Sequence, residues 1–254
     1  MELLATMISY IVTFALGFVF CKLLPDLKFR FHAFVKVKLM SNPQPLYFAF
    51  KEELLGKIKN VKSKFPEHQK TNSIRILEVG VGIGTNFKFY PDGCHLVVVD
   101  PNPHWEQYYN SNRSKFPQIK SQDIIVAYGE DMYMVPDESV DVVVITKVMC
   151  SVRNIKKMLQ QVRRVLVTGG KLFFIEHIRE WDAKNHGYRL FLQDFLSLLR
   201  IWPNMFSGCE LNRETLKDVE AAGFSSVEAE KKHAPITHPI FQISGSQVVG
   251  IATK

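Results

Sequence analysis

The chain has 254 residues, of which 46% are hydrophobic and 22% charged, and its formal net charge is +7. With an apolar N-terminus set aside, this length supports one globular domain with a substantial core, which excludes a disordered or fibrous protein. Four widely spaced cysteines without a Cys-x-x-Cys motif exclude a disulfide-rich scaffold and favour reduced thiols facing the cytosol. The cysteines and histidines show no zinc-ligand spacing, so no metal is predicted.

The first 24 residues differ from the rest of the chain. Leu3 to Cys21 is a run of nineteen uncharged residues, and a helix of that length rises roughly 28 Å, close to the hydrocarbon thickness of a bilayer. A cleaved signal peptide would need a basic start and a small-residue cleavage site, but Glu2 precedes the run and Lys22 to Pro25 follows it. A long buried core helix is the remaining alternative. We therefore predict an uncleaved membrane anchor over residues 1–24.

Residues 25–47 interleave basic and aromatic side chains. Lys28, Arg30, Lys36 and Lys38 alternate with apolar residues, which suits an amphipathic segment lying on an anionic membrane surface. The positive-inside rule then places the following domain in the cytosol. Nucleic acid is an alternative partner for a basic stretch, but the adjacent apolar run favours a lipid surface, and no nucleic acid is expected.

From residue 48 onward, strand and helix patterns alternate. The spacing predicts helices over 48–65 and 155–166 and from residue 212 or 213 to 223. Apolar runs predict strands at 73–79, 95–99, 123–127, 140–144, 171–175, 227–231 and 247–252. The last two are separated by a loop, which predicts an antiparallel pair. This order predicts an α/β domain over residues 48–254, with a Rossmann-like sheet of seven strands and helices on both faces.

The first of these strands leads directly into a glycine-rich turn. Gly80, Gly82 and Gly84 occupy alternate positions, so that the backbone can approach a ligand closely and offer its N–H groups. Asp100 ends the next strand, where its carboxylate can accept hydrogen bonds from ribose hydroxyls. These features predict a nucleotide-like cofactor beyond the carboxyl ends of the strands.

Two further residues distinguish the cofactor. A dinucleotide fingerprint would have glycine or alanine at position 85, where this chain has Thr85. Glu78 would repel a pyrophosphate at the turn but suits the ammonium group and sulfonium of S-adenosylmethionine (SAM). The predicted SAM contacts are Glu78, Gly80, Gly82, Gly84, Asp100, Pro101, Gly129, Glu130, Asp131, Met132 and Thr146, with Asp131 and Met132 framing the adenine.

Several sequence motifs narrow the family. Glu78–Tyr90 (EVGVGIGTNFKFY), Asp100–Pro103 (DPNP), Gly129–Met132 (GEDM), Val140–Val152 and Glu176-His177 occur in this order. With the apolar N-terminus, they resemble the methyltransferase-like 7 family, the thiol S-methyltransferases of endoplasmic reticulum and lipid droplets. The resemblance runs from about residue 51 to the C-terminus and implies the class I SAM-dependent methyltransferase fold. The family usually has Gly-Cys-Gly-Thr-Gly in the loop, where this chain has Val81 and Ile83 between the glycines, so SAM binding is still expected. Residues 179–210 match the family poorly, which leaves the substrate preference open.

Three groups of residues keep alternative roles. His177 follows a strand and can be either a catalytic residue facing the substrate or a structural histidine. Cys150 is predicted to be a small packing residue. The insertion has apolar residues at helical spacing that can pack in the core, roof a substrate pocket or touch the membrane. These residues are Trp181, Tyr188, Phe191, Phe195, Leu198, Leu199 and Trp202.

Together, these features predict a membrane-anchored, SAM-dependent methyltransferase of small lipophilic thiols, at the endoplasmic reticulum membrane or lipid droplets with its domain in the cytosol. A thiol is partly ionised near neutral pH, so its methylation requires no strong general base. One alternative is a methyltransferase of a lipid, sterol or quinone head group. Another is a membrane or lipid-droplet protein that binds SAM without turnover.

Overall fold

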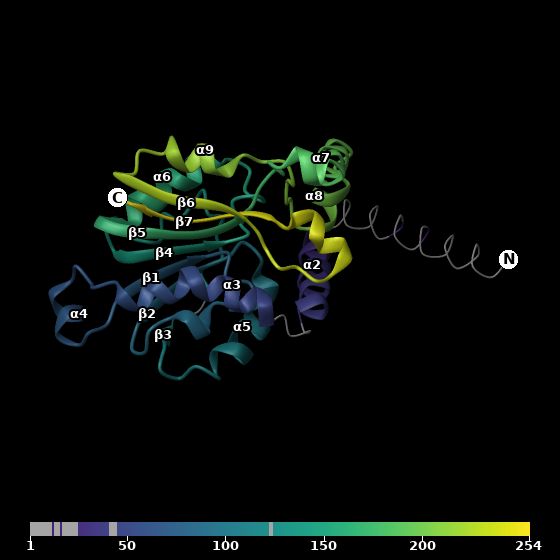
Figure 1. Cartoon of the computed structure of the whole chain (residues 1–254). Coiled ribbons are helices and arrows are strands. Elements are labelled where there is room, and N and C mark those ends of the chain that lie inside the picture. Colours follow the sequence, from purple (N-terminus) through teal and green to yellow (C-terminus); the bar gives the residue numbers. More distant parts are fainter. Residues whose placement is uncertain (1–11, 13–15, 17–24, 41–44, 122–123) are drawn as a thin grey trace.

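The computed structural model describes residues 12, 16, 25–40, 45–121 and 124–254 (Figure 1). The predicted anchor over residues 1–24 lies outside the described residues, apart from the isolated positions 12 and 16. Among the residues that are described, no helix is long and apolar enough to cross a membrane.

One mixed sheet forms the centre of the domain (Figure 1). Its seven strands, in order across the sheet, are β3 (Lys120–Ser121), β2 (His95–Val99), β1 (Arg75–Val79), β4 (Val140–Thr146), β5 (Leu166–His177), β7 (Ser246–Thr253) and β6 (Ser226–His233). Strands β1 to β5 are parallel to one another, whereas β7 is antiparallel to both β5 and β6. The predicted Rossmann-like sheet and its antiparallel final pair are therefore confirmed.

Helices cover both faces of this sheet and one of its ends (Figure 1). On one face lie α3 (Pro45–Leu55), the 3-10 helix η1 (Gly56–Asn60), α4 (Pro66–Lys70) and α5 (Glu106–Arg113), and on the other lie α6 (Ile155–Val165) and α9 (Thr215–Glu220). At one end lie α2 (Pro25–Met40), α7 (Ala183–Leu198) and α8 (Ile201–Met205). Three short 3-10 helices complete the description: η2 (Phe87–Phe89), η3 (Pro103–Trp105) and η4 (Pro239–Ser244).

The central strands are apolar on both faces because each face is covered by helices. In β4, Val142 and Val144 belong to the cluster that contains Leu55 of α3, while Val143 and Ile145 belong to the cluster of α6. This alternation follows from the two-residue period of a strand. A slip of one residue would move every side chain of β4 to the opposite face, so this pattern specifies the register of the strand.

The predicted helix over residues 48–65 is wrong at both ends. Helical structure begins at Pro45 and ends with η1 at Asn60. Beyond it, Ser63 Oγ donates to Asp141 Oδ2 at 2.8 Å and the Lys64 amide donates to Asp141 Oδ1 at 2.7 Å. The buried Asp141 carboxylate at the start of β4 thus holds this segment out of the helix, and the separate helix α4 follows it.

The third strand was predicted over residues 123–127, which is wrong. The structure has β3 at Lys120–Ser121, and among residues 124–127 only Ile125 makes an isolated bridge, to Val99. The Ile125 amide donates to the Val98 carbonyl at 3.0 Å, and the Asp100 amide donates to the Ile125 carbonyl at 3.1 Å. The chain therefore pairs with β2 at two separate points, in keeping with the short edge strands of many sheets.

Two other predicted boundaries also shift. Strand β5 begins at Leu166 rather than at residue 171, because Leu166 already pairs with Val140 before the register shifts. The predicted helix from residue 212 or 213 to 223 is the shorter α9. Upstream of α9, the Arg213 guanidinium instead donates to the carbonyls of Met149 and Val152 at 2.6 and 2.7 Å.

Helix α2, within the predicted basic segment, packs on the domain. The Asn102 side chain donates to the Phe29 carbonyl at 3.0 Å, next to the end of β2. A His32 ring nitrogen lies 3.2 Å from the Asn204 carbonyl of α8, and Ala33 is buried. Residues far apart in sequence therefore meet over the carboxyl ends of the strands.

Candidate active site

The glycine-rich loop follows β1, and its backbone has a conformation that would be strained for residues with a side chain. Gly80 and Gly84 have φ values of 75° and 74°, which L-residues with a side chain rarely adopt. A Cβ at Gly80 would lie 2.2 Å from Val148 Cγ2, and one at Gly84 would lie 2.5 Å from the Phe87 ring. The close approach expected at the glycines therefore occurs within the protein, to Val148 and Phe87.

Asp100 connects this loop to the end of β2. Its Oδ2 accepts a hydrogen bond from the Gly82 amide at 3.0 Å, and its Oδ1 accepts one from the Asn102 amide at 3.0 Å. A carboxylate oxygen can accept more than one hydrogen bond, and a carboxylate at the end of this strand is where nucleotide cofactors bind their ribose in such folds. Pro101 follows at the same strand end and is half-buried. The predicted position of this carboxylate is therefore compatible with ribose binding.

Glu78 acts inside the loop rather than facing the cavity. Its Oε1 accepts from Asn86 Nδ2 and its Oε2 accepts from the Tyr90 hydroxyl, both at 2.7 Å. Burial raises the pKa of Glu78 to about 7, against the lowering effects of the Tyr90 hydrogen bond and the Lys51 charge. Both oxygens thus tie β1 to the helical turn that follows the glycines, and the predicted contact with an ammonium group has no support from this geometry.

The Gly129–Met132 segment is largely structural in this arrangement. Glu130 Oε1 accepts from the amides of Arg153 and Asn154, immediately before α6. Met132 is fully buried in the core, whereas the side chain of Asp131 is exposed. A Cβ at Gly129 would approach Val79 and Met158 to within 3.1–3.3 Å. Of the predicted adenine contacts, Asp131 is the one whose side chain is accessible.

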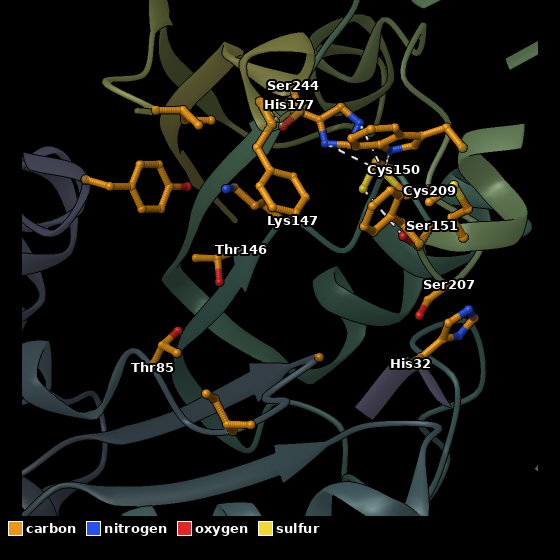
Figure 2. Close-up of a pocket in the computed structure, with 18 of the residues that line it drawn as sticks. His32, Thr85, Thr146, Lys147, Cys150, Ser151, His177, Ser207, Cys209 and Ser244 are labelled. Carbon is orange, nitrogen blue, oxygen red and sulfur yellow. Dashed lines mark hydrogen bonds between the residues drawn. The ribbon is translucent and has the colours of Figure 1, made fainter. Parts of the chain in front are cut away.

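A cavity of about 280 Å³ lies beyond the carboxyl ends of β1, β4 and β5 (Figure 2). Gly80 of the loop, Thr146 at the end of β4 and His177 at the end of β5 all line it, as the sequence predicted for this edge of the sheet. Its apolar walls include Phe48, Val81, Ile83, Trp202, Phe206 and Phe241. The volume is close to the lower end of small-molecule pockets, and the walls favour an apolar ligand with few polar anchors.

The insertion after β5 contributes part of this cavity. Trp202 of α8 is buried and lines it, together with Phe206 and Cys209. The other apolar residues predicted to pack, to roof the pocket or to touch the membrane are exposed or half-exposed. The roof is therefore formed by α8 and the turn after it rather than by α7.

Cys150, His177 and Cys209 form a buried group at this cavity. Cys209 Sγ lies 3.5 Å from His177 Nε2, and the Trp202 indole donates to the same sulfur at 3.1 Å. Hydrogen bonding from Cys209 lowers the pKa of Cys150 well below its ordinary value. Although burial lowers the pKa of His177, the adjacent Cys150 sulfur raises it, with a net rise above the ordinary value. Cys150 therefore does not only pack in the core, as the sequence predicted, but also interacts with His177 and Cys209.

Several cavity residues have no signal in the sequence. They are His32, Tyr47, Lys51, Cys209 and Ser244, which come from α2, α3, the turn after α8 and η4. No motif or spacing connects Cys209 with Cys150 or His177, because the tertiary fold alone brings them together. The segment Val140–Val152 contains Cys150, but its sequence does not identify the partners of that cysteine.

The part of the chain that contains the glycine loop is also similar to known proteins. A methyltransferase domain model matches residues 77–174, which contain the end of β1, the loop, Asp100, β4 and most of β5. In the YcgJ protein from Bacillus subtilis, the fold is similar with a TM-score of 0.57 and 16% identity, over 80% of this chain and 98% of that one. The fold, the loop and the domain match define a class I SAM-dependent methyltransferase, and SAM is its cofactor.

Two relatives identify the family within this class. Thiol S-methyltransferase TMT1B of Rattus norvegicus is 40% identical over 205 residues, covering 80% of this chain and 78% of the relative. Thiol S-methyltransferase TMT1A of Homo sapiens is 35% identical over 206 residues, covering 81% of each chain. The chain belongs to this thiol S-methyltransferase family.

Proposed function

We propose that this chain transfers the methyl group of SAM to the sulfur of small lipophilic thiols. The observation that carries the proposal is the cavity, which has mainly apolar walls and extends from the glycine loop to the Cys150–His177–Cys209 group. The names of the relatives, which describe thiol S-methyltransferases, support sulfur as the acceptor atom. The apolar walls support a lipophilic rather than a charged acceptor.

The chemistry requires position more than acid–base assistance. SAM supplies a sulfonium methyl group, whose C–S bond breaks with its electron pair as the new bond to the acceptor sulfur forms. The backbone at Gly80 and the Asp100 carboxylate would hold the cofactor, and Trp202 and Phe206 would hold the acceptor and exclude water. Fixing both partners in line supplies a large part of the acceleration. The thiol loses its proton before or during this step. His177 lines the cavity, and it is the catalytic side chain that we propose next to the acceptor.

We further propose that residues 1–24 anchor the protein in the endoplasmic reticulum membrane or at lipid droplets, with the domain facing the cytosol. The uncharged run from Leu3 to Cys21 supports the anchor. The exposed side of α7 adds support, because Tyr188, Phe191 and Leu198 are 62%, 67% and 80% exposed. Large apolar side chains on one helix face are typical of contact with a membrane or another protein. Helix α7 contacts α8, which lines the cavity, so a lipophilic acceptor would have a short path from the bilayer.

An acceptor screen with methyl-labelled SAM tests the proposal. Purified full-length protein in detergent is given alkyl thiols, phenols, amines and membrane lipids, with Asp100→Ala protein as the control for cofactor-dependent labelling. We expect label in the alkyl thiols well above all other classes. Label confined to a lipid, sterol or quinone would replace the proposed acceptor, and SAM binding without product from any class would identify a binding protein.

A further inference from the structure

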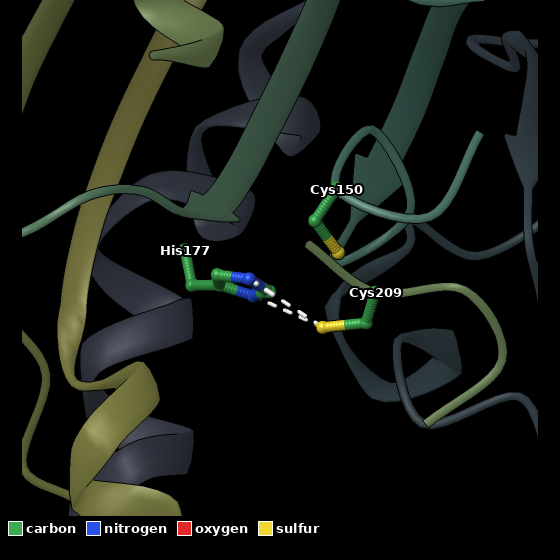
Figure 3. A group of neighbouring side chains, drawn as sticks. All are labelled: Cys150, His177 and Cys209. Carbon is green, nitrogen blue, oxygen red and sulfur yellow. Dashed lines mark hydrogen bonds between the residues drawn. The ribbon is translucent and has the colours of Figure 1, made fainter. Parts of the chain in front are cut away.

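Two thiols and an imidazole converge at one side of the cavity (Figure 3). One ligand atom each from Cys150, His177 and Cys209 lies within 4.8 Å of the other two, and all three side chains are buried. Cys209 Sγ lies 3.5 Å from His177 Nε2 and 4.0 Å from Nδ1. In a tetrahedral zinc site, a sulfur and a nitrogen ligand are separated by about 3.6 Å, given bonds of about 2.3 and 2.0–2.1 Å. The group therefore needs only small shifts to surround one ion.

A hydrogen bond to the backbone defines which ring nitrogen of His177 can bind a metal. His177 Nε2 lies 3.1 Å from the Glu210 carbonyl, which can accept its proton. With Nε2 donating to that carbonyl, Nδ1 is the ring nitrogen that can bind a metal, and it lies 4.0 Å from Cys209 Sγ, about 0.4 Å more than the spacing of a tetrahedral zinc site. A ligating histidine in metalloproteins usually donates its other ring N–H in this way, to a carbonyl or a carboxylate.

The two cysteines are held by contacts between separate segments. The Glu210 amide donates to the Cys150 carbonyl at 2.9 Å, which joins the turn after β4 to the turn after α8. Glu176 Oε1 accepts from the amides of Val148 and Met149 at 2.8 and 3.0 Å, which fixes the turn that carries Cys150. The Trp202 N–H donates to Cys209 Sγ at 3.1 Å and so holds this sulfur in place, although burial raises the pKa of Cys209 well above its ordinary value, so that an ion would have to displace its proton. The ligand geometry is thus built before any ion binds.

We propose that Cys150, His177 and Cys209 bind a zinc ion whose fourth position opens to the cavity and takes the sulfur of the thiol acceptor. Two thiolates and one imidazole with an open position are a known ligand set of catalytic zinc. All three residues line the cavity, so an ion among them can meet a small ligand there. The acceptor half of this inference rests on the proposed thiol methylation, whereas the metal half does not.

The proposed zinc ion would account for the deprotonation of the acceptor thiol. The thiol RSH binds as a thiolate and releases one proton to solvent, because a coordinating thiol is deprotonated outright. The group of zinc, two cysteine thiolates and the acceptor thiolate then has a net charge of −1, opposite to the sulfonium. When the sulfur takes the methyl group, the sulfonium C–S bond breaks with its electron pair, and the site retains zinc with its two cysteine thiolates. The neutral thioether product is a weaker ligand than a thiolate and can leave.

Cobalt serves as the probe for this site, because Co²⁺ is coloured and replaces zinc in tetrahedral sites. Full-length protein is stripped with a chelator under reducing conditions and titrated with Co²⁺. We expect one ion per chain, a visible spectrum of tetrahedral cobalt and a thiolate-to-cobalt charge-transfer band. Zinc should abolish both signals, and a small alkyl thiol should change them. Cys209→Ala should weaken zinc binding by about 100-fold or more, whereas Cys94→Ala, at a buried cysteine outside the group, should leave it unchanged.

A second measurement covers the case in which the Cys209 variant does not fold. In wild-type protein, zinc should protect Cys150 and Cys209, but not Cys94, from alkylation as the protein is slowly unfolded. No tetrahedral spectrum, a spectrum that persists in Cys209→Ala, or equal alkylation with and without zinc would overturn the metal site. A spectrum that thiols do not alter would overturn the acceptor role. Thiol methylation by metal-free protein would overturn the acceptor role but leave the proposed function intact. A cobalt site without thiol methylation would overturn the proposed function and the acceptor role but leave the metal site intact.

Discussion

At the scale of single residues, Asp100 is the side chain on which cofactor binding depends most directly. Asp100→Ala removes the carboxylate that accepts from the Gly82 and Asn102 amides and is placed to accept from a ribose. A hydrogen bond to a charged group contributes about 1.5–3 kcal/mol, which corresponds to roughly tenfold or more in SAM affinity. Calorimetric titration with SAM measures this change. Asp92→Ala, at an exposed carboxylate before β2, is the matched control, and an unchanged affinity in Asp100→Ala would contradict the site.

Glu78 makes stability depend on pH. Burial raises its pKa from 4.5 to about 7 in the folded protein, so the folded state keeps a proton that the unfolded state has lost. The stability that this proton provides is complete below the unfolded pKa and is lost as the pH rises through about 7. Glu78→Gln stays neutral, so its melting temperature relative to wild type should rise between about pH 5 and about pH 8. Thermal unfolding measures this difference.

The control for Glu78 is Glu220→Gln, which removes an exposed carboxylate at the end of α9. Its melting temperature should follow that of wild type across the same pH range. A constant difference between Glu78→Gln and wild type would show that the carboxyl of Glu78 does not change its protonation there.

Sequence patterns predict the position of residues such as Asp100, but they do not predict the hydrogen-bond partners of Glu78. The position of Asp100 follows from the end of an apolar strand, which is a local feature. The bonds from Asn86 and Tyr90 to Glu78 depend on how the turn after the glycines folds back on β1. Glu130 is a similar case, because it accepts hydrogen bonds from the amides of Arg153 and Asn154, which lie 23 and 24 positions further along the chain.

At the scale of elements, Asp141 joins the chain before β1 to the start of β4. Its carboxylate accepts from the Ser63 hydroxyl and from the amides of Lys64 and Arg75 at 2.7–2.9 Å, and it is buried. Asp141→Asn replaces one acceptor with a donor facing these N–H and O–H groups. The free energy of unfolding should fall by about 1.5–3 kcal/mol. Denaturant titration measures this loss, with Asp92→Asn as control, and an unchanged unfolding midpoint would contradict the role.

Elements with a strong local pattern were predicted well. The strands at β1, β2 and β4 and the helix α6 are apolar runs or amphipathic repeats, so their existence and type follow from periodicity. The edge strand β3 and the division of the segment 48–65 were missed, because Asp141 and the Ile125 bridge act across the fold. Tertiary hydrogen bonds therefore decide the boundaries that periodicity leaves undetermined.

At the scale of the whole molecule, the cavity is made from parts that no short window of sequence connects. Helix α2 contributes His32, the turn after α8 contributes Cys209, and η4 contributes Phe241. The sequence predicts where the cofactor binds, because glycines and carboxylates follow the strands. It does not predict the acceptor side, since the insertion after β5 forms that side only when it packs back over the sheet.

Deletion of residues 2–24 tests the proposed anchor. The domain should remain folded, because the strands and the glycine loop all lie downstream of residue 51. The truncated protein should move largely to the soluble fraction, with some salt-sensitive membrane association through Lys28 and Arg30, each contributing about 1 kcal/mol near an anionic surface. Cell fractionation followed by carbonate washing measures this change.

The full-length protein is the control for that deletion. It should resist both high salt and carbonate, and protease added to intact microsomes should digest its domain. Release of the full-length protein by salt alone, or a domain protected from protease, would contradict the anchor or its orientation.

The most direct test of the central claim compares a small alkyl thiol with the alcohol of the same carbon skeleton. Purified full-length protein is incubated with SAM carrying a deuterated methyl group, and the products are identified by mass spectrometry. The account predicts the deuteromethyl thioether from the thiol in stoichiometric balance with S-adenosylhomocysteine, no ether from the alcohol, and a loss of product in Asp100→Ala at limiting SAM. Equal methylation of thiol and alcohol, or S-adenosylhomocysteine formation that the thiol does not increase, would contradict it.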